Sequence, residues 1–202
     1  MNRASFSREA ADFRRQAMID ATAACLAEKG VGGTSVRAIC LRAGVSSGLL
    51  RHYFDGVDAL IAETYRATTV RMAQTVAAAV AEAGEDKRAR LIAYVTANFR
   101  SPIADPAVLS TWIAFWSLVR SDPEIAAIHK ESYAAFRAEL EALLADCGLP
   151  PAQRGPVAIA LTALVDGLWL ELSLDSSTLS GDQASAIAIR WVDTLLGQPE
   201  LG

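Results

Sequence analysis

Apolar residues recur with helical spacing from early in the chain. Between residues 7 and 29 they fall at i, i+3, i+4, i+7 and i+8, which defines one face of a helix on Met18, Ala21, Thr22, Cys25 and Leu26. The glycines at positions 30, 32 and 33 are expected to end that helix. A second, shorter helix with the same periodicity is predicted from the N-cap candidates Thr34 and Ser35 to Ala43.

Two small residues mark a tight turn after this second helix. Gly44 can adopt the left-handed backbone conformation that such a turn needs, and Ser46 can cap a third short helix over residues 47–53. The Asp55-Gly56 pair then predicts a turn into a long helix from about residue 57 to residue 83. Three helices and a tight turn are therefore expected before the first long helix.

The rest of the chain is also helical in pattern. Proline, glycine and serine clusters separate five more segments, at residues 86–100, 106–120, 124–146, 153–174 and 182–196. No segment alternates apolar and polar residues with period two, and 39 of the 202 residues are alanine, the strongest helix former. The sequence predicts an all-α protein of about nine helices.

Composition and charge limit the class of protein. A hydrophobic content of 52% supports a substantial core, and a net charge of −4 argues against nucleic-acid binding by the chain as a whole. The charge is unevenly divided, because residues 1–55 hold eight Lys or Arg against five Asp or Glu, whereas residues 56–202 hold eleven against eighteen. A basic head suits a protein in which only the head meets a polyanion, although so small an excess can arise by chance.

No catalytic or metal-binding constellation is visible. Cys25, Cys40 and Cys147 share no paired spacing, so we expect three small buried groups rather than a disulfide framework or a zinc site. His52 and His129 lie in separate parts of the chain, and His129 is expected to be solvated. No glycine-rich phosphate loop follows a strand. We therefore expect no enzyme activity, no metal and no cofactor.

A cytoplasmic protein that engages no membrane is expected. The polar N-terminus lacks the apolar stretch of a signal peptide. The most apolar segment, residues 157–174, is interrupted by Asp166 and Glu171, which argues against a membrane span.

The helices and turn from Thr34 to Phe54 have the arrangement that places a recognition helix in the major groove of DNA. Ser47 and Arg51 lie four residues apart on one face, and an arginine there can pair with guanine or with a phosphate. Arg37 and Arg42 suit either phosphate contacts or solvated charges. The candidate DNA-contacting residues are Thr34, Ser35, Arg37, Ser46, Ser47, Gly48, Arg51, His52 and Tyr53.

This region resembles the DNA-binding domain of TetR-family transcriptional regulators. The resemblance rests on residues 34–40, residues 43–54 and Leu60, and residues 18–22 and 26–30 resemble the first helix of that domain. It implies a homodimer that binds a palindromic operator on double-stranded DNA with its heads and a small effector, which releases the DNA, with its bodies. We accordingly expect a DNA-binding domain over residues 1–55 and a ligand-binding and dimerisation domain over residues 56–202.

Two positions depart from the family pattern. Cys40 stands where the family usually has alanine, and Val57 stands where a lysine usually begins the fourth helix. Because the lysine resembles a phosphate contact, its loss implies a salt dependence that is weaker by about one phosphate.

Large aromatic residues gather in the predicted helices of the body. The candidate ligand-binding residues are Phe99, Trp112, Phe115, Trp116, Tyr133 and Trp169. Their ring faces can form a cage for an organic cation, with Asp166 or Glu171 as the opposite charge, or they can simply fill the core. Residues 51–54, 112–116, 121–124 and 166–170 resemble the BetI-type branch of the TetR family, whose members are choline-responsive repressors of glycine betaine synthesis genes. That resemblance makes choline one candidate effector.

The last two predicted helices offer a surface for dimerisation. The candidate interface residues are Leu161, Leu168, Ile187, Trp191 and Leu195. Two such helices from each of two subunits would form a four-helix interface, and packing within one chain is the alternative. The alternative function to a regulator is a helical adaptor that binds only protein, but an adaptor would not need the helix-turn-helix.

Overall fold

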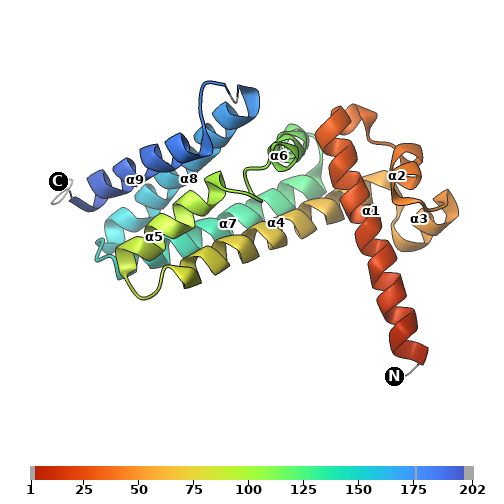
Figure 1. Ribbon diagram of the computed structural model, residues 1–202, viewed down its shortest axis with the longest axis horizontal. Helices are drawn as coiled ribbons and strands as arrows, with labels where there is room; N and C mark the ends of the chain where they lie inside the picture. Colours follow the sequence, from red (N-terminus) through yellow and green to blue (C-terminus); the bar gives the residue numbers. More distant parts are fainter. Residues whose placement is uncertain (1–2, 176, 198–202) are drawn as a thin grey trace. The chain divides into compact units, whose positions relative to one another are not determined.

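The computed structural model describes residues 3–175 and 177–197, with side chains from residue 11 onward. Within these ranges the chain forms nine α-helices, one short 3₁₀ helix and no strand (Figure 1), which confirms the all-α prediction. The elements are α1 Arg3–Gly33, α2 Val36–Ala43, α3 Ser47–Tyr53, α4 Gly56–Glu82, α5 Lys87–Thr96, η1 Ala97–Phe99, α6 Pro106–Leu118, α7 Pro123–Asp146, α8 Pro151–Leu174 and α9 Gly181–Gly197.

These helices divide into two compact units. The first comprises residues 1–69 and 110–128, and the second comprises residues 70–109 and 129–202. The first unit thus contains the expected 55-residue head together with the beginning of α4, most of α6 and the first turns of α7. A functional boundary after residue 55 remains a prediction.

The core of the first unit joins its four N-terminal helices. Met18, Ile39, Leu50 and Leu60 come from α1, α2, α3 and α4 and are all fully buried in one cluster. The α6 helix adds a polar contact, because the Thr111 hydroxyl donates to the Ala23 carbonyl oxygen of α1 over 3.2 Å. The predicted apolar face of the first helix therefore faces the core.

The end of the first helix differs in one detail from the prediction. Gly30 is non-helical, with φ 62° and ψ −171°, but one further turn to Gly33 follows it. The N-cap of α2 is Ser35 rather than Thr34, because the Ser35 Oγ accepts a hydrogen bond from the Ala38 N–H over 3.2 Å.

In the second unit, α9 packs against both α5 and α8. The α5 helix ends at Thr96, earlier than the sequence predicts, and η1 continues the chain. The side chain of Asn98 accounts for this ending, since its Nδ2 donates to the carbonyl oxygens of Tyr94 and Val95 over 2.9 and 3.1 Å. It thereby satisfies acceptors that a longer helix would have bonded to its own backbone.

The α8 helix has an unusually apolar composition. Among the described residues it is the one helix long and apolar enough to cross a membrane, with a mean hydropathy of 1.7 over its best window, of which 39% is buried within the chain. The helix passes this test of length and hydropathy although it contains Asp166 and Glu171. Core helices of soluble proteins have the same composition, so composition alone does not decide whether α8 packs against protein.

Candidate functional site

The turn between α2 and α3 has the geometry that the sequence predicts. Gly44 is left-handed, with φ 66° and ψ 32°, and the Val45 N–H donates to the Cys40 carbonyl oxygen over 3.0 Å. Ser46 caps α3, because its Oγ accepts a hydrogen bond from the Leu49 N–H over 3.1 Å. A left-handed residue here favours glycine, which has no Cβ to clash. The two helices of the motif therefore meet at a turn that glycine and serine define.

The α3 helix buries one side and exposes the other. Leu50 is fully buried, while Ser47, Gly48, Arg51 and His52 are exposed. Tyr53 is partly buried and packs against the core of the first unit, and its ring lies 5.4 Å from that of His52. The four exposed candidates form an open surface that can approach the edges of bases in a DNA groove.

Gly48 has no packing reason to be a glycine. A Cβ built on it would meet only the Ser46 Oγ, at 3.9 Å, and its φ is not positive. The missing side chain leaves room for a partner outside the subunit, which fits close approach of this backbone to a duplex.

Several polar candidates are already engaged within the head. Thr34 is only 7% exposed, and its hydroxyl donates to the Gly30 carbonyl oxygen over 2.8 Å. Its predicted role at the DNA surface is therefore corrected, because this side chain closes the turn before α2. Arg42 donates two hydrogen bonds to Glu28 of α1, at 2.8 and 2.5 Å, which lowers the pKa of Glu28. The exposed Arg37 and Ser35 are better placed than Arg42 to meet a phosphate.

Two of the predicted ligand-binding residues pack around a tyrosine that sequence reasoning missed. In the first unit Tyr65 of α4 stacks on Phe115, with ring centroids 4.4 Å apart and an interplanar angle of 4°. Trp112 meets the Tyr65 ring edge-on at 5.1 Å. Tyr65 and Phe115 are fully buried and Trp112 is 4% exposed, whereas Trp116 is partly buried. For Phe115 and Trp112 this packing supports the alternative of core filling.

A cluster of polar and aromatic groups lies between α7 and α8 in the second unit. The Tyr133 hydroxyl donates to Asp166 Oδ1 over 3.0 Å. The Arg137 guanidinium lies 5.7 Å from the Tyr133 ring centroid, and the His129 ring lies 4.1 Å from the same ring. The sequence had predicted a solvated His129, but this histidine is partly buried against Tyr133, which lowers its pKa.

Burial raises the pKa of Asp166 to about 6, and the Tyr133 hydrogen bond and the Arg137 charge partly oppose that rise. A carboxyl group with this pKa changes its charge close to neutral pH. Trp169 lies one turn further along α8, and its Nε1 donates to the Asn98 carbonyl oxygen over 2.7 Å. Phe99 follows Asn98 in η1 and is likewise buried. The structure thus brings Trp169 and Asn98 together, and separately Tyr133 and Asp166.

Comparisons with known proteins identify the family of the chain. Residues 18–64 match the family described as "Bacterial regulatory proteins, tetR family", and residues 87–197 match "BetI-type transcriptional repressor, C-terminal". The chain is a BetI-type member of the TetR family of transcriptional regulators. The family match to the head covers the helix-turn-helix described above.

Relatives of this BetI-type regulator cover nearly the whole chain. The HTH-type transcriptional regulator BetI of Burkholderia thailandensis is 34% identical over 92% of this chain and 94% of its own length. A crystal structure of a transcriptional regulator from Pseudomonas aeruginosa PAO1 has 40% identity and a TM-score of 0.83, covering 92% of this chain and 91% of that one.

A more distant solved structure shares the fold of the BetI-type regulator. It is a transcriptional regulator from Saccharomonospora viridis in complex with choline, with 18% identity and a TM-score of 0.76, covering 89% of this chain and 95% of that one.

Members of this family bind DNA and regulate transcription, and they are not enzymes. The prediction of a DNA-binding regulator without catalytic activity is therefore confirmed.

The dimer candidates of the BetI-type regulator fall on two different surfaces. Leu161 and Leu168 are 0% and 9% exposed, so they pack inside their own subunit, which corrects their predicted role in an interface. The outward side of α8 is mostly apolar instead: it exposes Glu171 together with the apolar or small residues Ile159, Ala160, Ala163, Gly167, Leu170 and Leu174. On α9, Ile187 and Trp191 are exposed and Leu195 is partly exposed, so their place in an interface stays a prediction.

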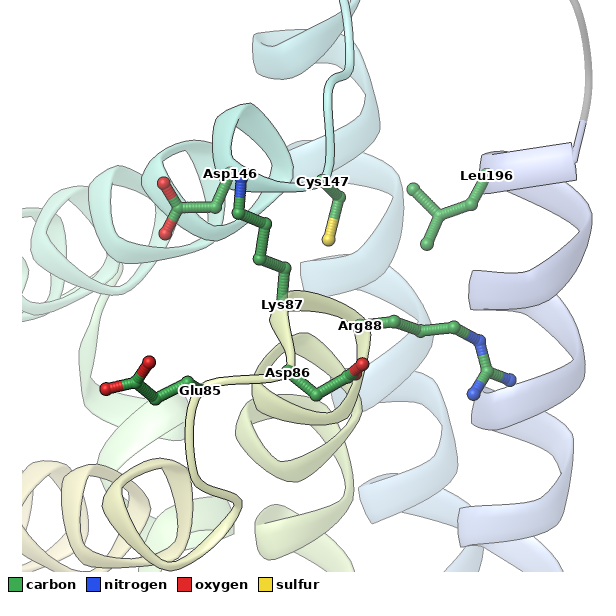
Figure 2. A pocket seen from close by; sticks show the side chains of 7 residues that line it. All are labelled: Glu85, Asp86, Lys87, Arg88, Asp146, Cys147 and Leu196. Carbon is green, nitrogen blue, oxygen red and sulfur yellow. The ribbon is translucent and has the colours of Figure 1, made fainter.

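A shallow pocket of about 440 Å³ lies elsewhere in the second unit (Figure 2). It is lined by Glu85, Asp86, Lys87, Arg88, Asp146, Cys147 and Leu196, and by none of the predicted aromatic residues. Its charges are largely satisfied within the chain, since Asp86 caps α5, Arg88 pairs with Asp193, and Asp146 lies 3.7 Å from Arg90. This pocket is therefore a weaker candidate for an effector site than the cluster at Asp166.

Proposed function

We propose that this BetI-type regulator is a homodimeric repressor that leaves a palindromic operator when a small organic cation binds the second unit. Choline is the first candidate for that cation. The observation that carries the proposal is the partly buried carboxyl group of Asp166, which lies beside the ring of Tyr133 and one helical turn from Trp169.

The DNA-binding part of the proposal rests on the exposed surface of α3. Ser47, Gly48 and Arg51 present small groups and one guanidinium, and a Cβ built on Gly48 would meet only the Ser46 Oγ, at 3.9 Å. An arginine that binds guanine bidentately contributes discrimination of about 1–3 kcal/mol. Two such helices in a symmetric dimer would read two half-sites about one helical turn, ~34–36 Å, or a multiple of it apart.

The effector part rests on charge and aromatic surface. A quaternary ammonium is attracted to an aromatic ring face by about 0.5–2 kcal/mol and to a carboxylate by its opposite charge. Tyr133 supplies the ring beside Asp166, and the choline complex of the Saccharomonospora viridis regulator supports this choice of cation. Arg137 competes with such a cation for Asp166, because its positive charge also acts on this carboxylate. It does so by its charge alone, whereas Tyr133 forms a hydrogen bond. An effector must therefore approach the carboxylate more closely than Arg137 does.

The dimer part rests on the apolar outer sides of α8 and α9. The helix α8 leaves much of its apolar surface outside its own subunit, and α9 exposes Ile187 and Trp191. Small residues at Ala160, Ala163 and Gly167 would let a second helix come close. A four-helix contact between two copies would cover these surfaces, and a cytoplasmic repressor would gain two heads for a two-fold operator.

Isothermal titration calorimetry tests the effector. Choline is titrated against the purified protein, with 3,3-dimethylbutanol as a neutral molecule of the same shape. We expect heat with choline and at least about tenfold weaker binding of the neutral analogue, since a lost charge contact of about 1.4 kcal/mol changes affinity tenfold. The variant Asp166→Asn keeps an acceptor for the Tyr133 hydroxyl and should weaken choline in the same way.

The matched control is Glu171→Gln, which removes the same charge from an exposed position on the same helix. Unchanged choline affinity is expected for it. If neither choline nor betaine aldehyde produces heat, the cationic effector is wrong. If Asp166→Asn binds choline as well as the unaltered protein, the site is wrong.

A gel shift tests whether the effector releases the operator. Genomic DNA recovered with the purified protein is sequenced, and the enriched duplex is titrated at low salt. Retardation that choline reverses supports release of the operator, whereas retardation that choline leaves unchanged contradicts it.

A further inference from the structure

An arginine of α1 lies against the end of the recognition helix. The Arg15 guanidinium carbon is 5.5 Å from the ring centroid of Phe54, which caps α3 and whose N–H donates to the Leu50 carbonyl oxygen. Phe54 is 7% exposed and belongs to the core of the first unit. Arg15 therefore covers a buried ring that fixes where α3 ends, and a guanidinium over an aromatic face is an attractive contact.

Arg15 is held by a carboxylate of α4. Its Nη2 lies 2.5 Å from Glu63 Oε1 in a hydrogen-bonded ion pair. The other oxygen of Glu63 faces Arg66, with a distance of 3.7 Å from Oε2 to Nη1. Glu63 thus lies between two positive charges, and its removal would leave Arg15 and Arg66 to repel each other.

Arg66 in turn reaches α7. Its Nη2 donates to Glu124 Oε1 over 2.9 Å. Glu124 lies in the first turn of α7, where its backbone N–H is fixed by Asp122 Oδ1 over 2.9 Å. The four charges alternate in sign from α1 through α4 to α7, and all belong to the first compact unit.

This series of charges connects α1, which contacts the end of the recognition helix, to α7. Arg15 touches the residue that closes the recognition helix, while α7 is a continuous helix that also carries Tyr133 and Arg137. Each ion pair is partly exposed, so each alone adds little to stability. A connected series can nevertheless couple the position of one helix to that of another.

We propose that the series Arg15–Glu63–Arg66–Glu124 positions the recognition helix and makes operator affinity depend on the position of α7. The proposal goes beyond the choice of effector, because it concerns the protein without ligand. Its residues are positioning residues, since none lies on the exposed surface of α3.

A plain charge effect and a positioning role predict opposite changes in operator affinity for two variants. Glu63→Gln and Glu124→Gln each remove a negative charge from a protein that binds a polyanion, so electrostatics alone would tighten operator binding. Loss of the positioning contacts would weaken it instead. We expect about three- to tenfold weaker binding of the enriched operator duplex by each variant, within the range by which substitutions along a coupling network change the coupling between sites.

The matched control is Asp58→Asn, a change of the same charge in the first turn of α4 outside the series. Fluorescence anisotropy with the operator duplex is recorded for all variants at several salt concentrations. The slope of log affinity against log salt should stay unchanged for Glu63→Gln and Glu124→Gln, because no phosphate contact is lost. Tighter binding by both variants, matching Asp58→Asn, would overturn the proposal.

A double-mutant cycle tests the connection over its whole length. Arg15→Met and Glu124→Gln share no direct contact, so independent effects on operator affinity should multiply. We expect the loss of affinity in the double variant to be at least about threefold smaller than the product of the two single losses. Multiplicative effects would show two unconnected ion pairs. Because choline is absent, a failure here is distinct from a failure of the proposed effector.

Discussion

The Tyr133 hydroxyl on α7 donates a hydrogen bond to Asp166 on α8 over 3.0 Å, which places a titratable acid beside an aromatic ring in the second unit. Burial raises the pKa of this acid to about 6. The pair therefore makes effector binding sensitive to pH in a range that is easily studied.

Choline affinity should fall as the pH is lowered through 6. The carboxylate is charged above its pKa of about 6 and neutral below it, so the attraction for a cation disappears on acidification. Titration calorimetry between pH 5 and 8 should show up to about a tenfold loss per pH unit below the pKa. The variant Asp166→Asn should give a flat profile over the same range, and a sloping one would assign the pH dependence to another group.

The same carboxyl group affects folding with a defined sign. Its folded-state pKa of about 6 exceeds the ordinary value of 3.8, so the folded protein binds more protons between these values. The free energy of unfolding should therefore decrease as the pH rises from about 4 to 6, by roughly 1–3 kcal/mol. Urea denaturation of the unaltered protein and of Asp166→Asn isolates this contribution, because the variant lacks the titration. The unaltered protein should therefore lose stability relative to Asp166→Asn as the pH rises from about 4 to 6, and a gain over this range would contradict the assignment.

Replacing Gly48 with alanine should affect folding and DNA binding in opposite directions. A Cβ there meets only the Ser46 Oγ at 3.9 Å, and alanine favours a helix over glycine by up to about 1 kcal/mol. The melting temperature should therefore stay the same or rise. Operator affinity should fall, because the new methyl group stands on the exposed surface of α3. Undiminished affinity would remove this part of α3 from the DNA contact.

The substitution Val57→Lys should restore a phosphate contact. Val57 lies in the first turn of α4 and is partly buried. A lysine stem can pack along the same surface while its ammonium reaches outward. Operator affinity measured from 50 to 200 mM salt should then show a slope about 0.9 larger per head in contact with DNA. An unchanged slope would mean that this position does not reach the duplex.

Trp191→Glu should separate the subunits. This side chain is 51% exposed on α9, beside Ile187 and within the proposed dimer surface. Burying an unpaired carboxylate between two copies would cost several kcal/mol, so sedimentation velocity at micromolar concentration should show monomers. Arg190→Glu is a control on the neighbouring exposed position. A stable Trp191→Glu dimer would place the interface elsewhere.

Much of the helical structure follows from local signals. Gly44, Ser46 and Ser35 fix the ends of α2 and α3 through left-handed geometry and side-chain caps, which act within a few residues. The end of α5 could not be foreseen, because it depends on how the Asn98 amide folds back on the carbonyl oxygens before it.

The outward side of α8 could not be chosen from periodicity. This helix is apolar on nearly all sides, so the stripe through Leu161 and Leu168 and the stripe through Ile159 and Leu170 look alike in the sequence. Only packing shows that the first stripe faces the subunit. Tyr65 was missed for a similar reason, since its stacking on Phe115 joins residues far apart in the chain.

The hydrogen bond from Thr111 to Ala23 has a practical consequence for engineering. Together with the stacking of Phe115 on Tyr65, it makes α6 a structural part of the unit that holds the helix-turn-helix. A fragment cut after residue 55 would lose these supports, and a chimera that exchanges only the first 55 residues with a relative would pair a foreign head with an unmatched α6. Operator preference should therefore be transplanted by changing the exposed side chains of α3 alone, leaving the supporting scaffold intact.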